Sequence, residues 1–452
     1  MANRINQLIT GLILFVAIFY IIGLEKLPIG YDEGGFATGA KIILNGGQIY
    51  KDFFEYRTPG IYYLTSAFFA MFGDSLFLLR IFIVLITLFS VFVFYKIVKK
   101  MDGKRTALLT SLLILTAKPF LDTNVMVLTE GITMAFTIFA LYFLLYKKPK
   151  SRDYFLAGIL LGISFLFKQT ALVAILAIIL FLLYKRRVKE TLYLAIPSAA
   201  IMLLFFAVFS YVDIFYYLFT FGSQILTMEA FTKIRVWFWF LFPVIWLGYA
   251  YLIRETIHKR ITLMSIIAIF IILCLLPLRE IWGHSFTQVL FFMAYFASKA
   301  GLELFRMKNR IVTMVVLLLI LASLVIFVQS SVTAKVSCYF NNSQCSDLRN
   351  AQYATVDYLK GKDGSIFADT PLFYYMLDKK MPYYTFGIVG APVSVFGLSD
   401  LVPTLEQNRT DYLIFAKSIY TEKVTSYNII EYVQEKYDLV FEKDPYMVFK
   451  RR

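Results

Sequence analysis

Long apolar runs with few charged residues constrain this chain more than any other feature. Examples are residues 8–24, 76–98 and 311–328. Runs of about 20 such residues cross a lipid bilayer as helices. Only 17% of the 452 residues are charged, against about a quarter in soluble domains. We therefore predict a polytopic α-helical membrane protein. No small-residue cleavage site follows the first run, so we expect it to be retained as an anchor rather than removed as a signal.

The basic residues lie in short loops between the apolar runs. The net charge is +15, and the clusters are at 99–105, 147–152, 185–189, 254–260 and 299–310. Short loops rich in Lys and Arg remain cytoplasmic, so these clusters predict topology. A nucleic-acid partner is excluded, because the basic residues form no single patch.

A single threading with about eleven spans places every basic cluster inside. The first span leads out to a loop at 25–75, and the last, 311–329, ends outside. The spans between them are 76–98, 106–117, 127–146, 154–167, 170–184, 191–211, 236–253, 261–277 and 286–298. Several are shorter than the roughly 20 residues of a straight crossing, and the hairpin at 154–184 is the least defined. We expect a multi-pass protein of the plasma membrane, with residues 1–329 forming its transmembrane domain.

Residues 330–452 are polar and mixed, which predicts a small α/β domain outside the membrane. Helices are expected at 347–360, 371–378 and 424–436, and strands at 365–369, 411–416 and 446–450; this alternation is typical of α/β domains. Cys338 and Cys345 could close a disulfide, which an oxidising compartment favours. Asn341 and Asn408 begin glycosylation sequons. Both hints agree with an outer location.

The loop at 25–75 carries the most suggestive polar residues. Tyr31-Asp32-Glu33 follows the first span, and Arg57 precedes Pro59. Apolar residues at helical spacing predict short helices at 36–44 and 61–72, lying at the membrane surface. Long ordered loops tend to be functional. Two interpretations of the acids stay open at this point: a catalytic site, or a structural role in which Asp32 caps the first helix and Arg57 pairs with Glu55.

Further ionisable residues reach the same outer face under this threading. Glu130 opens an apolar helix, Lys168 sits at the turn of a hairpin, and His284 lies outside with Gln288 one turn later. An ionisable residue at membrane depth is a functional candidate, although Glu130 could also stabilise a helix N-terminus and Lys168 could snorkel. Because nucleotide-activated substrates are absent from that face, a group-transfer enzyme there needs a lipid-carried donor.

The motifs that carry this chemistry occur in a recognisable order. They are Asp32-Glu33-Gly34, Gly46-Gly47-x-x-Tyr50-x-Asp52-Phe53, Arg57-Thr58-Pro59-Gly60, Thr129-Glu130, Gly158-x-x-x-Gly162 through Phe167-Lys168, and Gly283-His284-x-x-x-Gln288. Together they resemble the GT-C superfamily of membrane glycosyltransferases, closest to the branch of the protein O-mannosyltransferases and the lipid A aminoarabinose transferase. The family usually has Lys-Pro-Pro where this chain has Arg57-Thr58-Pro59. The cation and second proline are kept, and the first proline is not.

The resemblance implies an inverting transfer of a sugar from a polyprenyl-phosphate donor to a glycan, lipid or protein acceptor. It implies Asp32 as the general base, with Glu33 orienting it or binding the acceptor, and Glu130 as a second acid. Arg57 would hold the donor phosphate, with Lys168 and His284 as weaker candidates. The substrate cavity would include Tyr31, Tyr50, Asp52 and Gln288. No metal site is assigned; a divalent metal cofactor stays open, since some members of the superfamily use one.

Two alternatives remain beside this interpretation. One is an oligosaccharide transferase or polymer ligase on the same scaffold. The other is a non-enzymatic glycolipid transporter or flippase, which should show repeated halves with broken helices at the midplane. The sequence shows no such repeat, and its ionisable residues gather at one face. Membrane lipids are expected partners in every case.

Overall fold

The computed structural model describes residues 2–146, 148–210, 245–275, 283–306, 344–381, 401–417 and 429–452, with a few single residues between 214 and 325. The chain forms two compact units. The first, here called the helical unit, comprises residues 1–22, 80–214 and 227–333. The second, the mixed unit, comprises residues 23–79, 215–226 and 334–452. The loop at 25–75 thus clusters with the C-terminal residues.

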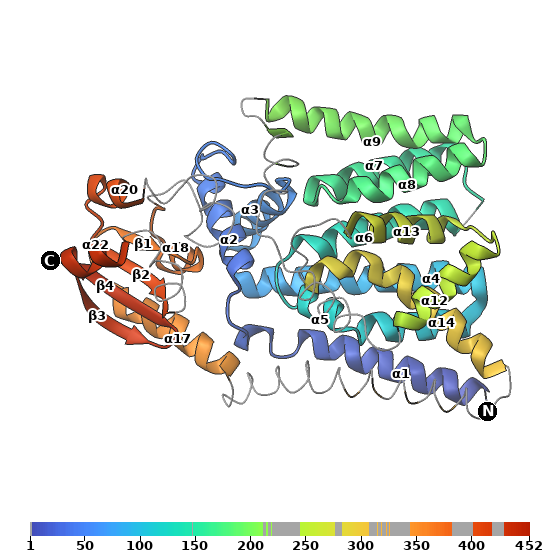
Figure 1. Cartoon of the computed structure of the whole chain (residues 1–452), viewed down its shortest axis with the longest axis horizontal. Helices are drawn as coiled ribbons and strands as arrows, with labels where there is room; N and C mark the ends of the chain where they lie inside the picture. Colours follow the sequence, from blue (N-terminus) through green and yellow to red (C-terminus); the bar gives the residue numbers. More distant parts are fainter. Residues whose placement is uncertain are drawn as a thin grey trace. The chain divides into compact units, whose positions relative to one another are not determined.

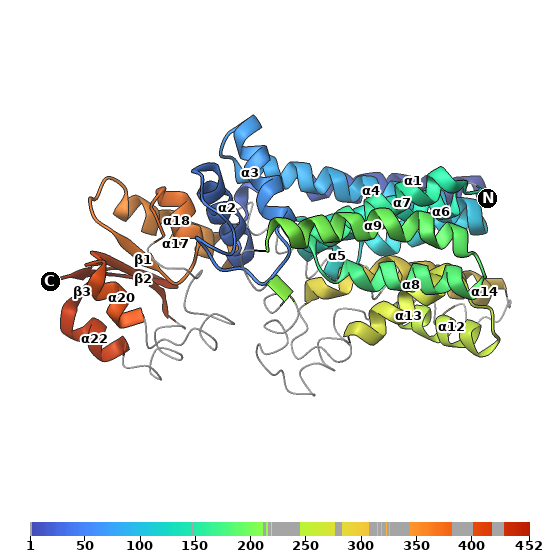
Figure 2. The ribbon, with the colours of Figure 1, turned by 90° about the horizontal axis from the view of Figure 1, so that it is seen from above.

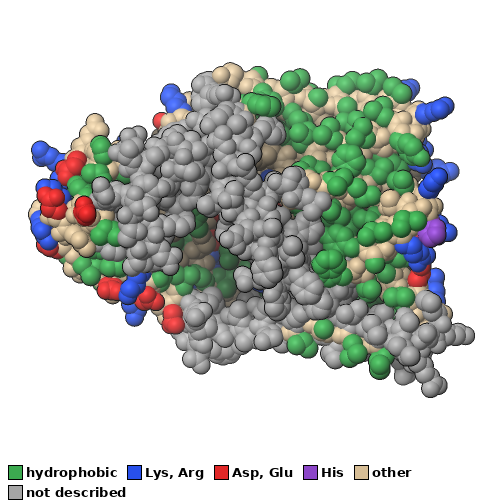
Figure 3. Space-filling model, viewed as in Figure 1, with side chains coloured by type: hydrophobic (Ala, Val, Ile, Leu, Met, Phe, Trp, Pro, Cys, Tyr) green, Lys and Arg blue, Asp and Glu red, His purple; other side chains and the backbone are tan. Residues whose placement is uncertain are grey.

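The helical unit consists of apolar helices that lie side by side along one direction (Figures 1 and 2). Its described helices are α1 (Ala2–Ile21), α4 (Leu76–Leu115), α5 (Lys118–Asn124), α6 (Thr129–Leu145), α7 (Ser151–Phe167), α8 (Ala171–Tyr184), α9 (Val188–Val208), α12 (Ile245–Ile257), α13 (Leu263–Leu275), the short 3-10 helix η3 (Gly283–Phe286) and α14 (Thr287–Arg306). The part of α4 from Arg80 onward belongs to this unit. Helices that are apolar on all sides are typical of membrane spans. On the face seen in Figure 3, apolar side chains cover much of the surface of this unit that is not grey, and Lys and Arg side chains gather at one end of it.

α4 is a helical hairpin rather than one rod. Gly103 has a φ of 87°, a left-handed conformation that glycine adopts without steric cost. Before this turn, Asp102 accepts a hydrogen bond from Tyr295, well along α14. After it, Thr123 at the end of α5 bonds to Thr287, the first residue of α14. The chain therefore reverses at Gly103, as predicted for helices at 76–98 and 106–117.

The described helices occur where membrane spans were predicted. Three of them, Ile9–Lys26, Leu76–Leu115 and Val188–Val208, contain segments long and apolar enough to cross a membrane, and Thr129–Leu145, Ala171–Tyr184 and Leu263–Leu275 are shorter and apolar. The predicted span at 311–329 lies outside the described residues. The count of about eleven spans therefore stays a prediction. α5 was not predicted, because its Lys118-Pro119 start reads as a loop.

The C-terminal part of the mixed unit is a four-stranded sheet with helices on both faces (Figure 2). The strands are β1 (Ile366–Ala368), β2 (Tyr412–Ala416), β3 (Tyr437–Lys443) and β4 (Tyr446–Arg451), in the order β1-β2-β4-β3. β1 pairs parallel to β2, and the other pairs are antiparallel. The helices are α17 (Gln344–Leu359), α18 (Leu372–Leu377), α20 (Leu401–Gln407) and α22 (Ile429–Lys436).

One face of this sheet packs against α20 and α22. Phe367, Phe415 and Phe449 are buried there against Leu405 and Val433. The small α/β arrangement is confirmed, while β3 and α20 were not predicted. The disulfide proposed between Cys338 and Cys345 and the Asn341 sequon lie outside the residues whose side chains are described.

Two helices of the first loop, α2 (Tyr31–Leu44) and α3 (Gly60–Phe72), pack against each other in the mixed unit. The Phe36 and Tyr62 rings meet edge to face with centroids 5.2 Å apart. Both helices were predicted, but α2 begins five residues earlier than expected. Asp32 and Glu33 therefore lie in the first turn of a helix.

α2 rests on residues from the far end of the chain. The Gln352 side chain bonds to both the N–H and the C=O of Ile29, just before α2. The Thr38 hydroxyl donates to the Pro371 carbonyl at 2.8 Å. An ideal Cβ on Gly34 would lie 2.8 Å from Leu372, so only glycine allows this approach. We call these contacts, made by Ile29, Gly34 and Thr38, the α2 seat.

Candidate functional site

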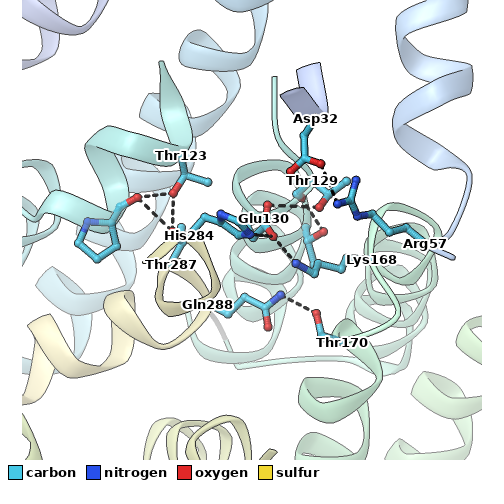
Figure 4. Close-up of polar contacts among 12 residues, drawn as sticks. Asp32, Arg57, Thr123, Thr129, Glu130, Lys168, Thr170, His284, Thr287 and Gln288 are labelled. Atoms are coloured by element: carbon cyan, nitrogen blue, oxygen red, sulfur yellow. Dashed lines mark hydrogen bonds and ion pairs between the residues drawn. The ribbon is translucent and has the colours of Figure 1, made fainter. Parts of the chain in front are cut away.

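An ion pair joins the first turn of α2 to the loop before α3. Arg57 Nη2 lies 2.8 Å from Asp32 Oδ1 (Figure 4). The same nitrogen donates to the Tyr56 hydroxyl at 3.0 Å, and the guanidinium lies 5.4 Å from the centre of the Phe36 ring. The Asp32 side chain is 27% exposed and that of Arg57 is 18% exposed. Within the described residues the other Asp32 oxygen, Oδ2, has no hydrogen-bond partner.

The charge of Arg57 is secured by its neighbours. Burial lowers the pKa of Arg57, but the Asp32 carboxylate and the surrounding oxygens raise it, and the net pKa lies well above its ordinary value. Burial raises the pKa of Tyr56 to about 12, so its hydroxyl is neutral at physiological pH. The site therefore holds one cation and one carboxylate in contact.

Glu33 and Glu55 have different surroundings from Asp32. Glu33 is fully buried, and its Oε2 accepts the Gly30 N–H at 3.4 Å, at the start of α2. Glu55 accepts the backbone N–H groups of Tyr56 and Arg57 and the hydroxyl of Tyr62. The structural interpretation had Asp32 capping the first helix and Arg57 pairing with Glu55. Instead, Glu33 makes the contact at the start of α2, and the Arg57 side chain pairs with Asp32.

The other residues predicted in this loop lie at different places. Tyr50 is buried, and its hydroxyl donates to the Arg57 carbonyl at 2.6 Å, so it supports the loop that carries Arg57. Asp52 is exposed and accepts the Gln48 N–H at 2.6 Å within a turn. Tyr31, the first residue of α2, is 40% exposed beside Asp32.

A second group of ionisable residues lies in the helical unit. Glu130, in the first turn of α6, is 2% exposed. Lys168, at the end of α7, bonds to Glu130 Oε1, and His284 Nε2 lies 3.6 Å from the same oxygen (Figure 4). Thr129 donates to the other oxygen, Oε2, at 3.3 Å. The sequence placed these three residues on one face, and the structure brings them into contact.

Polar side chains extend this group along α14. Gln288 donates to the Thr170 hydroxyl at 2.5 Å, and Thr287 bonds to Thr123 at 2.7 Å (Figure 4). Sequence reasoning had named Gln288 but missed the threonines. Isolated threonines in apolar helices more often bond to their own helix backbone, so nothing in their spacing marked these.

Each group has its own charge balance. The group at the start of α2 is the ion pair of Asp32 and Arg57. In the helical unit, Lys168 and His284 both lie against the carboxylate of Glu130. Cations of this kind hold phosphate groups. Across the described parts of the chain, no three His, Cys, Asp or Glu side chains gather closely enough to hold a metal ion.

Comparisons with known proteins relate this geometry to characterised enzymes. Residues 56–215 match the family described as dolichyl-phosphate-mannose-protein mannosyltransferase. The matched segment includes Arg57, Glu130 and Lys168. A search of curated protein sequences finds no match.

The structural matches extend over nearly the whole chain. ArnT from Cupriavidus metallidurans, solved bound to undecaprenyl phosphate, aligns with a TM-score of 0.63 at 12% identity, over 99% of this chain and 98% of that one. The archaeal oligosaccharyltransferase AglB from Archaeoglobus fulgidus, solved with an inhibitory peptide and a dolichol-phosphate, aligns with a TM-score of 0.54 at 11% identity, over 97% of this chain and 74% of that one. The fold is that of the GT-C glycosyltransferases. The resemblance expected from the motifs is thereby confirmed.

Proposed function

We propose that this protein is an inverting membrane glycosyltransferase that moves a sugar from a polyprenyl-phosphate donor to an acceptor at the outer face of the membrane. The observation that carries the proposal is the Asp32–Arg57 pair. It joins a partly exposed carboxylate, with one oxygen unpartnered among the described residues, to a permanent cation. A general base and a phosphate ligand are the two groups that such a transfer requires.

Asp32 would act as the base through Oδ2. The acceptor hydroxyl or amine attacks the anomeric carbon of the sugar and gives its proton to Asp32. The bond between that carbon and the phosphate oxygen breaks, and its electron pair leaves with the polyprenyl phosphate. Because attack and departure occur on opposite sides of the carbon, the configuration inverts.

Arg57 would hold the phosphate of the departing lipid. A planar guanidinium can donate two parallel hydrogen bonds to a phosphate. When the phosphate engages Arg57, it competes with Asp32 for the same cation. Asp32 then loses part of its charge stabilisation and becomes a stronger base. Donor binding would in this way activate the catalytic carboxylate.

The remaining residues fit supporting roles. Lys168 and His284 are further candidates for holding negative charge on the donor, with Glu130 fixing their positions as the second acid of the site. Glu33 is fully buried, which favours a role in orienting the start of α2 over contact with the acceptor. Gln288 and Thr170, which bond to each other, would lie beside the sugar donor.

Two other functions compete with this proposal. An oligosaccharide transferase would use the same residues on a larger donor, and the similarity to AglB keeps this alternative. A glycolipid flippase would need no base. It would therefore tolerate the loss of the Asp32 carboxylate.

The test compares two isosteric substitutions in the same loop. Asp32→Asn and Glu25→Gln would each be expressed in a strain lacking the gene, and cell-surface glycans and glycolipids would be analysed by mass spectrometry. Loss of a general base lowers the rate by about 10²–10⁴-fold, so Asp32→Asn should fail to restore the missing glycan. Glu25→Gln, which changes an exposed side chain at the start of the loop, should restore it. Full restoration by Asp32→Asn, at equal amounts of membrane-inserted protein, would refute the assignment.

A further inference from the structure

A pocket lies at the opposite end of α14 from the Glu130 group. It has a volume of about 520 Å³ and is lined by residues 102–106 at the α4 turn together with Leu302, Phe305 and Arg306 of α14. Along α14, Leu302 follows Gln288 by fourteen residues, or roughly 21 Å at 1.5 Å per residue. The pocket is thus separate from the Glu130 group.

The pocket is strongly basic. Lys104, Arg105 and Arg306 line it and are exposed. None of these three side chains has an acidic partner among the described residues. Three uncompensated cations around one cavity repel each other, which favours an anion between them.

The nearby acids are already neutralised. Asp102, the acid that lines the pocket, bonds to the Tyr295 hydroxyl at 2.6 Å and lies 3.2 Å from the Lys299 ammonium. Glu303, next to Leu302 on α14, pairs with Arg254 at 2.6 Å. The positive charge of the pocket therefore remains after the local ion pairs are counted.

The turn at Gly103 adds to the positive electrostatic potential of the pocket. Because Gly103 interrupts α4, the returning segment begins at Lys104, and the N-terminus of a helix favours negative charge. The apolar part of the lining, Leu302 and Phe305, suits a molecule that is charged at one end and hydrophobic at the other.

We propose that this pocket binds the phosphate-bearing headgroup of an anionic membrane lipid, in the leaflet at the end of α14 away from the Glu130 group. Lys104, Arg105 and Arg306 hold the phosphate, and Leu302 and Phe305 contact the start of the acyl chains. The lipid ties the α4 turn to the end of α14. This role is independent of sugar transfer.

The test measures binding of phosphatidylglycerol to purified, delipidated full-length protein by native mass spectrometry. The pocket variant is Lys104→Gln/Arg105→Gln/Arg306→Gln. The control variant, Lys185→Gln/Arg186→Gln/Lys189→Gln, removes the same charge from another exposed basic loop of the helical unit. A basic residue near anionic lipid contributes about fivefold in affinity. The pocket variant should therefore bind at least about tenfold more weakly, while the control changes by less than about twofold.

Three results would overturn the proposal. Equal weakening in both variants would show that only general surface charge attracts the lipid. Equal binding of phosphatidylcholine and phosphatidylglycerol would remove the requirement for an anionic lipid. Displacement of the lipid by millimolar inorganic phosphate would assign the pocket to a soluble anion. If the triple variant does not fold, the single substitution Arg306→Gln at an exposed position replaces it in the test. Its affinity for phosphatidylglycerol should fall about fivefold, and an unchanged affinity would contradict the proposed site.

Discussion

The close approach of Gly34 to Leu372 makes the α2 seat testable with a single methyl group. The Cβ of Gly34→Ala would lie 2.8 Å from the Cα, Cβ and N of Leu372. Two of these are backbone atoms, so the contact cannot be relieved by a side-chain rotation. Overpacking of this kind costs about 1–3 kcal/mol.

Gly35→Ala is the matched control. Its Cβ would lie 3.7 Å from Pro371 Cγ, an ordinary contact. Both substitutions gain about 1 kcal/mol of helix propensity, so this gain cancels in the comparison. Gly35→Ala should stabilise the protein, and Gly34→Ala should be less stable than Gly35→Ala by about 1–3 kcal/mol.

The assay is thermal unfolding of the full-length protein in detergent, followed by circular dichroism at one fixed scan rate because membrane proteins often unfold irreversibly. At about 2–4 °C per kcal/mol, Gly34→Ala should melt at least about 2 °C below Gly35→Ala. Equal melting temperatures would refute the packing of α2 on Leu372. We also expect Gly34→Ala to lower transfer activity, since it displaces the turn that carries Asp32.

Three further predictions concern buried polar groups. Lys168→Met leaves Glu130 without its nearest cation and should cost about 3–5 kcal/mol; adding Glu130→Gln should recover most of the lost thermal stability, and additive losses would contradict the pairing. Thr38→Val should cost about 0.5–1.5 kcal/mol by removing the hydrogen bond from the Thr38 hydroxyl to the Pro371 carbonyl, which keeps the Tyr374 N–H as a donor, while Thr38→Ser, which keeps the hydroxyl, should melt near the wild type. Burial raises the pKa of Asp369 to about 6, above its ordinary 3.8, so the folded state holds this proton more tightly than the unfolded state. Stability should consequently fall as pH rises from about 4 to 6, and melting curves of Asp369→Asn should lack this component; an identical pH profile would contradict it.

The apolar pattern was sufficient to predict most helices but not their exact starts. The helices predicted at 61–72 and 261–277 are strongly hydrophobic segments, and the structure has α3 and α13 within a few residues of them. α2 begins earlier than predicted because Tyr31, Asp32 and Glu33 are polar or aromatic and read as a loop. Their helical conformation depends on the α2 seat, whose partners lie more than 300 residues away.

The pairing of the site residues could not be predicted from the sequence either. Arg57 is two residues from Glu55 and twenty-five from Asp32, so sequence proximity suggested only Glu55 as a partner for Arg57. In the structure, Glu55 accepts hydrogen bonds from backbone N–H groups and from the Tyr62 hydroxyl, and the Arg57 side chain bonds to Asp32 instead. β3 was missed because its residues, Tyr437–Lys443, are largely exposed and continue the polar pattern of the helix before them.

The α2 seat also has a consequence for biogenesis. Thr38 and its partner Pro371 are separated by 333 residues, and ribosomes add about 5–20 residues per second. α2, which carries the proposed base Asp32, must therefore wait roughly 20–60 s until the residues that support it have been synthesised. During that interval Asp32 and Arg57 are already made but not yet held by the C-terminal segment. Under the proposed function, a nascent or truncated chain would thus be unable to transfer sugar until the last quarter of the protein has folded.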